Sequence, residues 1–234
     1  LEFISLAEEI GLIGQIGEFV LNKACEEFAS VFPSPEYNST LSINISPMQL
    51  MDKAFISQLK RAIEENHLPS NRITLEITEN VLISDLPKVT PIINQIKELG
   101  FTISLDDFGT GYSSLSYLSN LPLDELKIDR VFVDKMLSSE QSDSLVKAIL
   151  AIAQSASMRV VAEGVETEAQ KTVLIDYGCD VLQGYLIERP MPIAQLAEKY
   201  AAQGLRLLAL AWTDGEQEAD LKFKSRDQIP AIIE

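Results

Sequence analysis

The sequence predicts an α/β fold, a parallel barrel of the (β/α)8 class from which the first one or two strands are missing. Strand-like and helix-like segments alternate over the first 200 residues, and polar side chains recur at the ends of the predicted strands. The length of 234 residues suits one barrel domain, which typically has about 200 to 250 residues. With 46% hydrophobic and 23% charged residues, the chain has the composition of a globular protein with a full core.

The first half of the chain predicts four helices and three strands. Apolar residues at helical spacing predict helices over 3–10, 13–28, 55–65 and 89–99, and Gly100 is a plausible residue to end the last of these. Strict alternation in Leu41-Ser42-Ile43-Asn44-Ile45 predicts a strand over 41–45. The same pattern predicts strands over 73–77 and 101–105.

The second half predicts three further strands, over 125–128, 159–162 and 180–183, and helices over 145–156, 168–177 and 193–202. Strand, helix and strand in repetition imply parallel strands joined by right-handed crossovers. Six such units exceed a small doubly wound domain and fall short of eight. An incomplete barrel fits best, and a complete doubly wound sheet is the alternative.

We assign residues 1–203 to the barrel and 204–234 to a C-terminal extension. The pattern changes after Gly204: residues 205–212 and 219–224 flank Asp214-Gly215, a dipeptide typical of tight turns. The extension therefore predicts a hairpin that covers a barrel end, or a poorly packed tail. It contains no candidate site residue.

The charge of the chain limits its partners. A formal net charge of -16 and a pI of about 4.5 argue against binding of DNA or long RNA, whose phosphates such a surface repels. Cys25 and Cys179 lack the spacing of a zinc site or redox motif, which favours a reducing, cytoplasmic setting. No stretch approaches the roughly 20 apolar residues of a membrane span. A longer protein tethered through upstream segments remains compatible with these observations.

Polar side chains fall at the carboxyl ends of the predicted strands. In a parallel barrel these ends meet at one mouth, where active sites form. Gathered without a cation, the carboxylates among them would repel one another, and Mg²⁺ or Mn²⁺ would remove that conflict. These residues are Asn44, Glu76, Glu79, Asp106, Asp107, Lys127, Glu163, Glu166 and Gln183.

Each of these residues alone also has a purely structural interpretation. Asn44 precedes Ser46-Pro47 and fits a turn, and Glu76 in a strand fits a solvent-facing position. The pair Asp106-Asp107 fits a turn as well. Such a turn, beginning at Asp107 and allowed by Gly109 and Gly111, would bring both carboxylates to one metal centre, whereas a continuing strand would point them to opposite sides. The joint pattern favours the metal site.

At these residues the chain resembles the EAL-domain phosphodiesterases, in order and spacing, from about residue 1 to about residue 200. The run from Asp106 is highly specific. The matching runs are Asn-Ile-Ser from Asn44, Glu-Ile-Thr-Glu from Glu76, Asp-Asp-Phe-Gly-Thr-Gly-Tyr-Ser-Ser from Asp106, Leu-Lys-Ile-Asp from Leu126, Ala-Glu-Gly-Val-Glu from Ala162 and Gln-Gly-Tyr from Gln183.

The resemblance implies a modified TIM barrel that hydrolyses cyclic di-GMP to the linear dinucleotide with two Mg²⁺ or Mn²⁺ ions. It implies that Lys127, Glu163 and Asp106 are catalytic. It places Asp129 and Gln183 at the substrate. Glu79, Gly109 and Gly111 would stabilise the loop over 107–114, which couples metal binding to homodimer formation. The implied metal ligands are Asn44, Glu76, Asp106, Asp107 and Glu163, with Asp106 as the bridge between the metals.

The sequence departs from the family in one respect. The Glu-Ala-Leu motif that names the family, and the arginine two residues after it, do not occur in this chain. Residues 1–13 correspond to the helix after that motif. We therefore expect this chain alone to lack appreciable activity, and we expect an upstream sensor or diguanylate-cyclase-like domain in the whole protein.

Two other functions compete with hydrolysis. A non-catalytic cyclic di-GMP receptor would bind the dinucleotide and signal to a partner, but the family's ligand positions within the covered region are all filled here. A barrel lyase or isomerase with carboxylate-bound Mg²⁺ and a lysine base is permitted by the fold. The loop from Asp106 argues against it.

Overall fold

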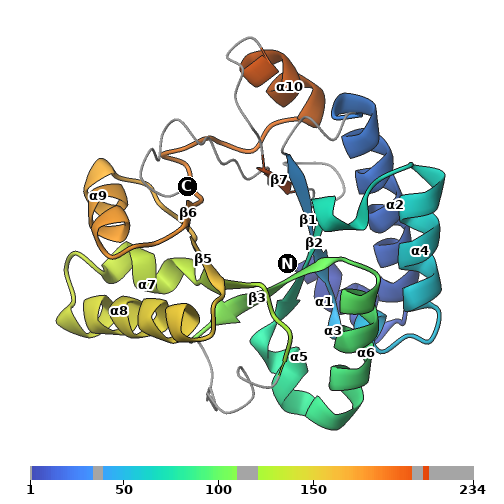
Figure 1. Cartoon of the computed structure of the whole chain (residues 1–234), viewed down its shortest axis with the longest axis horizontal. Coiled ribbons are helices and arrows are strands. Elements are labelled where there is room, and N and C mark those ends of the chain that lie inside the picture. Colours follow the sequence, from blue (N-terminus) through green and yellow to red (C-terminus); the bar gives the residue numbers. More distant parts are fainter. Residues whose placement is uncertain (1, 34–38, 110–120, 202–207, 211–234) are drawn as a thin grey trace.

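The computed structural model describes residues 2–33, 39–109, 121–201 and 208–210. Within this part of the chain, seven parallel strands form one curved sheet with helices around its outer side (Figure 1). The order across the sheet is β6-β5-β4-β3-β2-β1-β7. The strands are β1 (Thr40–Ile45), β2 (Ile73–Thr78), β3 (Thr102–Phe108), β4 (Glu125–Ile128), β5 (Arg159–Ala162), β6 (Val181–Leu182) and β7 (Leu208–Leu210).

The strand order distinguishes between the two folds that the sequence left open. From β1 to β6 each strand lies beside the next one along the chain, so the sheet winds in one direction throughout. A doubly wound sheet reverses its direction at a switch point. The fold is therefore a partial (β/α) barrel, as predicted. The described sheet has seven strands, compared with the eight of a closed barrel.

The structure contains every helix that the sequence predicts, and it adds shorter ones. Each of the seven predicted helices is present, with ends shifted by a few residues, and Gly100 and Gly178 follow helices with φ of 89° and 81°, a conformation that suits glycine. The helices are α1 (Glu2–Glu9), α2 (Ile13–Val31), α3 (Pro47–Leu50), α4 (Phe55–Glu65), α5 (Glu79–Ser84), α6 (Leu86–Glu98), α7 (Arg130–Lys135), α8 (Glu140–Ser155), α9 (Glu168–Asp176) and α10 (Ile193–Ala201), with a 3₁₀ turn η1 (Ser70–Arg72).

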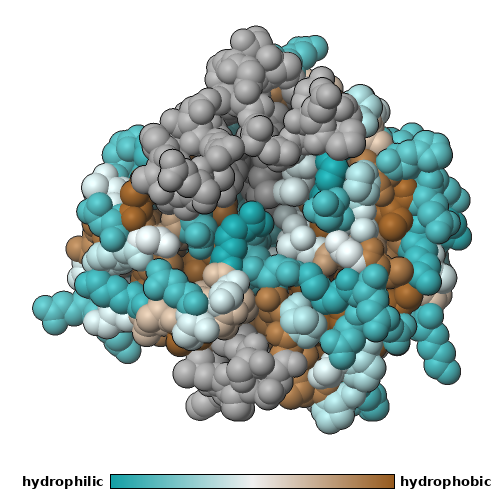
Figure 2. All heavy atoms as spheres, in the orientation of Figure 1, coloured by the Kyte–Doolittle hydropathy of each residue, from teal (hydrophilic) through white to brown (hydrophobic). Residues whose placement is uncertain are grey.

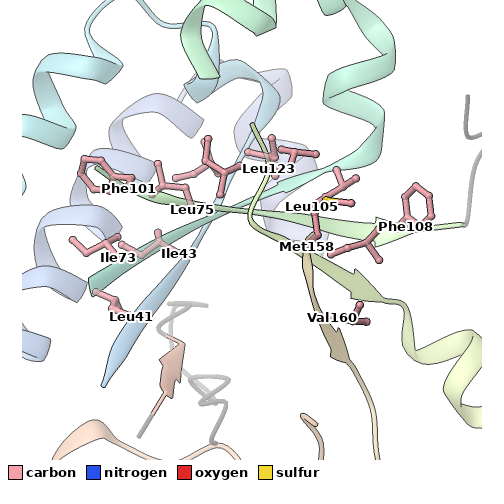
Figure 3. Close-up of a cluster of buried hydrophobic side chains, with 14 of the residues drawn as sticks. Leu41, Ile43, Ile73, Leu75, Phe101, Leu105, Phe108, Leu123, Met158 and Val160 are labelled. Carbon is pink, nitrogen blue, oxygen red and sulfur yellow. The ribbon is translucent and has the colours of Figure 1, made fainter. Parts of the chain in front are cut away.

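The hydrophobic core lies between the sheet and its helices. Leu41 and Ile43 on β1, together with Ile73 and Leu75 on β2, are almost fully buried and belong to this core (Figure 3). Since successive residues of a strand point to opposite faces, the intervening residues face the concave side of the sheet. Among these are Asn44 and Glu76, which lie opposite each other in the parallel register. The alternation thus separates the core from the polar face.

The start of the C-terminal extension joins the sheet. Leu208–Leu210 forms β7, which pairs in parallel with Thr40, Leu41 and Ser42 of β1. The predicted hairpin lies otherwise outside the described residues, including its proposed turn at Asp214-Gly215. The described part of the extension is therefore an edge strand that covers the backbone of β1.

Two simpler expectations concern cysteines and membrane spans. Cys25 and Cys179 are both buried and unbridged, and burial raises the pKa of the Cys25 thiol to about 12. Among the described helices none has the length and apolar character needed to cross a membrane.

Candidate functional site

A fully buried lysine lies at the centre of the candidate site. Lys127 on β4 has its ammonium nitrogen 2.7 Å from Glu76 Oε2, 2.8 Å from Asp106 Oδ2 and 2.7 Å from Glu163 Oε1. These carboxylates come from β2, β3 and the residue after β5, so four separate segments meet at one point. The side chain of Lys127 is 1% exposed, and those of Asp106 and Glu163 are 13% and 16% exposed. Lys127 thus lies at the buried side of the cluster, and Asp106 and Glu163 are partly accessible to solvent.

The register of the sheet explains why these residues meet. Thr78 lies opposite Asp106, and Lys127 lies opposite Val161 two residues before Glu163. All project from the carboxyl-terminal half of their strands. The backbone N–H of Glu163 donates to the carbonyl of Ile128, which continues the β4–β5 ladder up to the site. Figure 2 shows hydrophilic side chains over the middle of the face in view.

The charge state of Lys127 follows from its surroundings. Burial alone would lower the pKa of its ammonium group, but the three carboxylates outweigh burial and raise the pKa well above its ordinary value. In this arrangement Lys127 is therefore a cation and a hydrogen-bond donor.

The adjacent pair Asp106-Asp107 reaches the site by a different route from the predicted turn. The strand continues through both residues to Phe108, so the expectation of a turn beginning at Asp107 is wrong. Instead, Asp107 has a φ of 57° and the β3–β4 register shifts between Leu105 and Phe108. A bulge of this kind breaks the alternation of side chains. Both carboxylates therefore remain near the acidic cluster.

Asp107 lies in a strongly negative environment. Burial, and then the charges of Asp106, Asp129 and Glu163, raise the pKa of Asp107 to about 6. A side-chain hydrogen bond with Asp129 acts in the same direction. Among the described side chains of this cluster, the carboxylates of Glu76, Asp106, Asp107 and Glu163 thus outnumber the Lys127 ammonium.

The remaining predicted residues surround this cluster. Gln183, after β6, donates from Nε2 to Glu163 Oε1 at 3.2 Å, and Asp129 accepts from the backbone N–H of Val131 at 2.6 Å. Asn44 on β1 is half-buried beside Glu76 in the register. Asp129 and Gln183 were predicted to contact substrate, and here they contact Asp107 and Glu163.

Glu79 contacts the first residues after β3. Glu79, at the start of α5, accepts a hydrogen bond from the backbone N–H of Gly109 at 3.2 Å. Gly109 has a φ of 93°, which an L side chain would adopt only with strain. Gly111 lies outside the described residues.

Glu166, another predicted strand-end carboxylate, is not among the ion-pair partners of Lys127. It pairs instead with Arg130, a residue that the sequence analysis did not single out, at 2.7 Å. The available signal was indirect: Arg130 directly follows Asp129, and Gly164 directly follows Glu163.

The donor set fits hard divalent cations in chemistry. Carboxylate and amide oxygens from Asn44, Glu76, Asp106, Asp107 and Glu163 are the ligands that Mg²⁺ and Mn²⁺ prefer. In the arrangement described, no group of three or more histidine, cysteine or acidic side chains among the described residues is ready to hold a metal. The Lys127 ammonium lies where three of the carboxylates converge. Burial and the neighbouring carboxylates raise the pKa of Asp107, which is the direction expected for an acid in a negative environment.

Comparisons with known proteins agree with this geometry. The chain is 40% identical over 200 residues to the bifunctional diguanylate cyclase/cyclic di-GMP phosphodiesterase MucR of Pseudomonas aeruginosa, covering 86% of this chain and 29% of that protein. It is 39% identical over 196 residues to the cyclic di-GMP phosphodiesterase NbdA of the same organism, covering 84% of this chain and 25% of that protein. The chain thus spans between a quarter and a third of the length of these relatives.

A solved structure of the MucR phosphodiesterase in complex with c-di-GMP superposes with a TM-score of 0.80 at 40% identity. The match covers 83% of this chain and 79% of the solved one. Residues 1–190 match the sequence model of the EAL domain. A match over most of the chain, with relatives near 40% identity, shows that the chain belongs to the EAL domain family.

Proposed function

We propose that this chain forms the barrel part of a phosphodiesterase that hydrolyses cyclic di-GMP to the linear dinucleotide and depends on Mg²⁺ or Mn²⁺. The convergence of Glu76, Asp106 and Glu163 on the buried Lys127 carries the proposal. Family membership, and relatives named as cyclic di-GMP phosphodiesterases, support the reaction and its substrate.

The acidic residues of the site are suited to hold cations rather than to bind a phosphate diester directly. Asp106, Asp107 and Glu163 would repel the anionic substrate, so positive charge from solution has to accompany it. Asn44, Glu76, Asp106, Asp107 and Glu163 would hold that charge. When bound, Mg²⁺ or Mn²⁺ lowers the pKa of a water molecule and offsets negative charge on the phosphate.

Within the part of the chain that the structure describes, Lys127 supplies the positive charge at the centre of this cluster. Its raised pKa keeps it protonated, so it acts as a donor that orients a nucleophilic water or stabilises phosphate charge. A base would have to be neutral in order to accept a proton. The lyase or isomerase alternative needs such a lysine base, and the surroundings of Lys127 oppose it.

Gln183 and Asp129 lie at the edge of the cluster and have roles in orientation. Gln183 donates to Glu163 and so restricts how that carboxylate turns. Asp129 shares a hydrogen bond with Asp107 and also accepts from the start of α7. We propose that both also face the substrate, as the family resemblance implies.

Hydrolysis is tested with a longer version of the protein that includes the residues upstream of Leu1. With Mn²⁺, we expect the longer protein to convert cyclic di-GMP to the linear dinucleotide, and chromatography measures the conversion. After chelation of the metal we expect no conversion. The 234-residue chain alone should show no appreciable conversion. Persistence of cyclic di-GMP with the longer protein and Mn²⁺ would refute the enzyme assignment.

A receptor that only binds cyclic di-GMP is the alternative. It would retain the dinucleotide in equilibrium dialysis without converting it. The filled acidic positions favour the enzyme, because a pure receptor has no need for this excess of carboxylates. We further propose a cytoplasmic homodimer with an upstream sensor or diguanylate-cyclase-like domain.

A further inference from the structure

The side chain of Arg130 lies across the loop that follows β5. Its Nη2 is 2.7 Å from Glu166 Oε1. Its aliphatic part packs against Gly164: a Cβ placed on that glycine would lie 2.3 Å from Arg130 Cγ and 2.8 Å from Arg130 Cβ. Gly164 has a φ of 68°, so both its conformation and its close contact require glycine. One side of the loop is thus fixed by a single arginine.

The segment after β6 fixes the other side of the same loop. The backbone N–H of Val165 donates to Gln183 at 2.9 Å, and its carbonyl accepts from Leu186 at 3.0 Å. A Cβ on Gly184 would lie 2.3 Å from both the nitrogen and the oxygen of Val165. The loop over 163–166 is therefore held between Arg130 and the backbone after β6.

Glu163 is the first residue of this loop, and its carboxylate reaches Lys127 at 2.7 Å. We propose that Arg130 is a positioning residue for Glu163, acting through its packing on Gly164 and its ion pair with Glu166. Arg130 is not one of the ion-pair partners of Glu163, whose carboxylate pairs with Lys127. The proposal rests on the proposed function, because it assigns Glu163 to the metal-binding cluster.

A purely structural role for Arg130 in α7 makes a different prediction. Arg130 also pairs with Asp134 one helical turn later, at 3.2 Å. That pair lies within α7 and does not touch the loop. Because exposed ion pairs of this kind contribute little, the loop contacts need the additional packing of the arginine stem to have an effect. Asp134→Asn thus provides a matched control that removes one partner of Arg130 and leaves the loop contacts in place.

The first experiment measures amide hydrogen exchange of residues 163–166 in the intact chain without metal. For Arg130→Ala we expect exchange about tenfold faster at Val165 and Glu166, and for Glu166→Gln about two- to fivefold faster, the range expected for an exposed ion pair with added packing. Arg130→Lys keeps the charge and the stem and should restore most of the protection. Equal protection of the loop in Arg130→Ala and Asp134→Asn would overturn the proposal.

The second experiment titrates Mn²⁺ into the same variants by calorimetry. We expect Arg130→Ala and Glu166→Gln to weaken Mn²⁺ binding, and Asp134→Asn to match the unaltered chain. Faster exchange in Arg130→Ala combined with unchanged Mn²⁺ affinity would also overturn the positioning role. If the unaltered chain and the longer protein both fail to bind Mn²⁺, the proposed function fails instead, while the exchange experiment still tests whether Arg130 fixes the loop.

Discussion

The two ends of the parallel sheet are both acidic, but they differ in how the acids are compensated. At the amino end, Asp124 before β4 lies 2.6 Å from the ammonium of Lys97 and accepts from the backbone N–H of Ile103. Glu125 pairs with Arg159 at 2.6 Å in the same rim. Each of these two acids has a cation of its own.

The carboxyl end has the opposite balance. Glu76, Asp106 and Glu163 share the single ammonium of Lys127, and Asp107 adds further negative charge with a raised pKa. Paired acids serve stability, whereas an excess of acids costs stability and calls for cations from solution. On the proposed function, this difference separates carboxylates that serve stability from carboxylates proposed to hold cations.

Removing the shared cation should have the largest effect. Lys127→Met leaves Glu76 buried without its partner, and we expect a loss of about 3–5 kcal/mol in the free energy of unfolding. Lys97→Met at the amino end, where both partners are partly exposed, should cost about 1 kcal/mol. Urea unfolding without divalent metal measures both. Equal losses would remove the distinction between the two ends.

Adding a methyl group at a glycine should distinguish the ends next. Gly184→Ala places Cβ against the Val165 backbone, which cannot move aside, and should cost about 3 kcal/mol. Gly100→Ala meets only the hydroxyl of Ser70, which can rotate, and should cost about 1 kcal/mol for its left-handed backbone. Thermal unfolding of the two variants checks this order, and the reverse order would contradict it.

Divalent metal should stabilise the carboxyl end by a comparable amount. Mn²⁺ at about a hundred times its dissociation constant should add about 2.7 kcal/mol to the free energy of unfolding. The affinity should fall below pH 6, where Asp107 takes up a proton and metal has to displace it. Melting curves with Mn²⁺ and with a chelator, at pH 7.5 and pH 5, measure both effects. A Glu163→Gln chain serves as the control with reduced response.

The smallest expected effect concerns Asp107. The pKa of Asp107 in the folded chain, about 6, exceeds its ordinary value of 3.8. Its contribution to the free energy of unfolding is therefore most favourable below about pH 4, where the carboxyl group is protonated, and is lost as the pH rises through 6. At pH 7 without metal, Asp107→Asn should therefore stabilise the chain, by about 1 kcal/mol after allowance for solvent screening. The gain should shrink toward zero at pH 4.

Asp124→Asn provides the matched control at the other end of the sheet. Because Asp124 accepts from Lys97 and Ile103, its loss should destabilise the chain by about 1 kcal/mol at pH 7. The two asparagine substitutions should thus have opposite signs in denaturant titrations. Destabilisation by both would mean that the carboxyl end is also built for stability.

The strand alternation was sufficient to predict the polar face of the sheet. Ser42, Asn44 and Glu76 occupy alternate positions between residues of the hydrophobic core, so the sequence determines which side chains face inward. The parallel topology then places the strand ends together. The convergence of distant carboxylates was predictable for this reason.

Local backbone geometry was less predictable. A strand and a turn both fit Asp106-Asp107-Phe108, and the bulge that the structure adopts depends on the pairing of β3 with β4. The pairing of β7 with β1 could not be predicted either, since no local pattern in residues 208–210 specifies its partner. The contact between Arg130 and Gly164 likewise depends on the distance between the start of α7 and the loop after β5, which the sequence pattern does not specify.

The distribution of the site over the sheet has a consequence for folding. Its residues run from Asn44 on β1 to Gln183 after β6, so strands far apart in the sequence have to come together to form it. Contacts at such long sequence separation form slowly, because a large loop has to close before they contribute. A folding intermediate with only β1–β3 paired would contain Asn44, Glu76 and Asp106 without Lys127. Mn²⁺ binding should therefore develop only in the last kinetic phase of refolding, when β4 and β5 join the sheet.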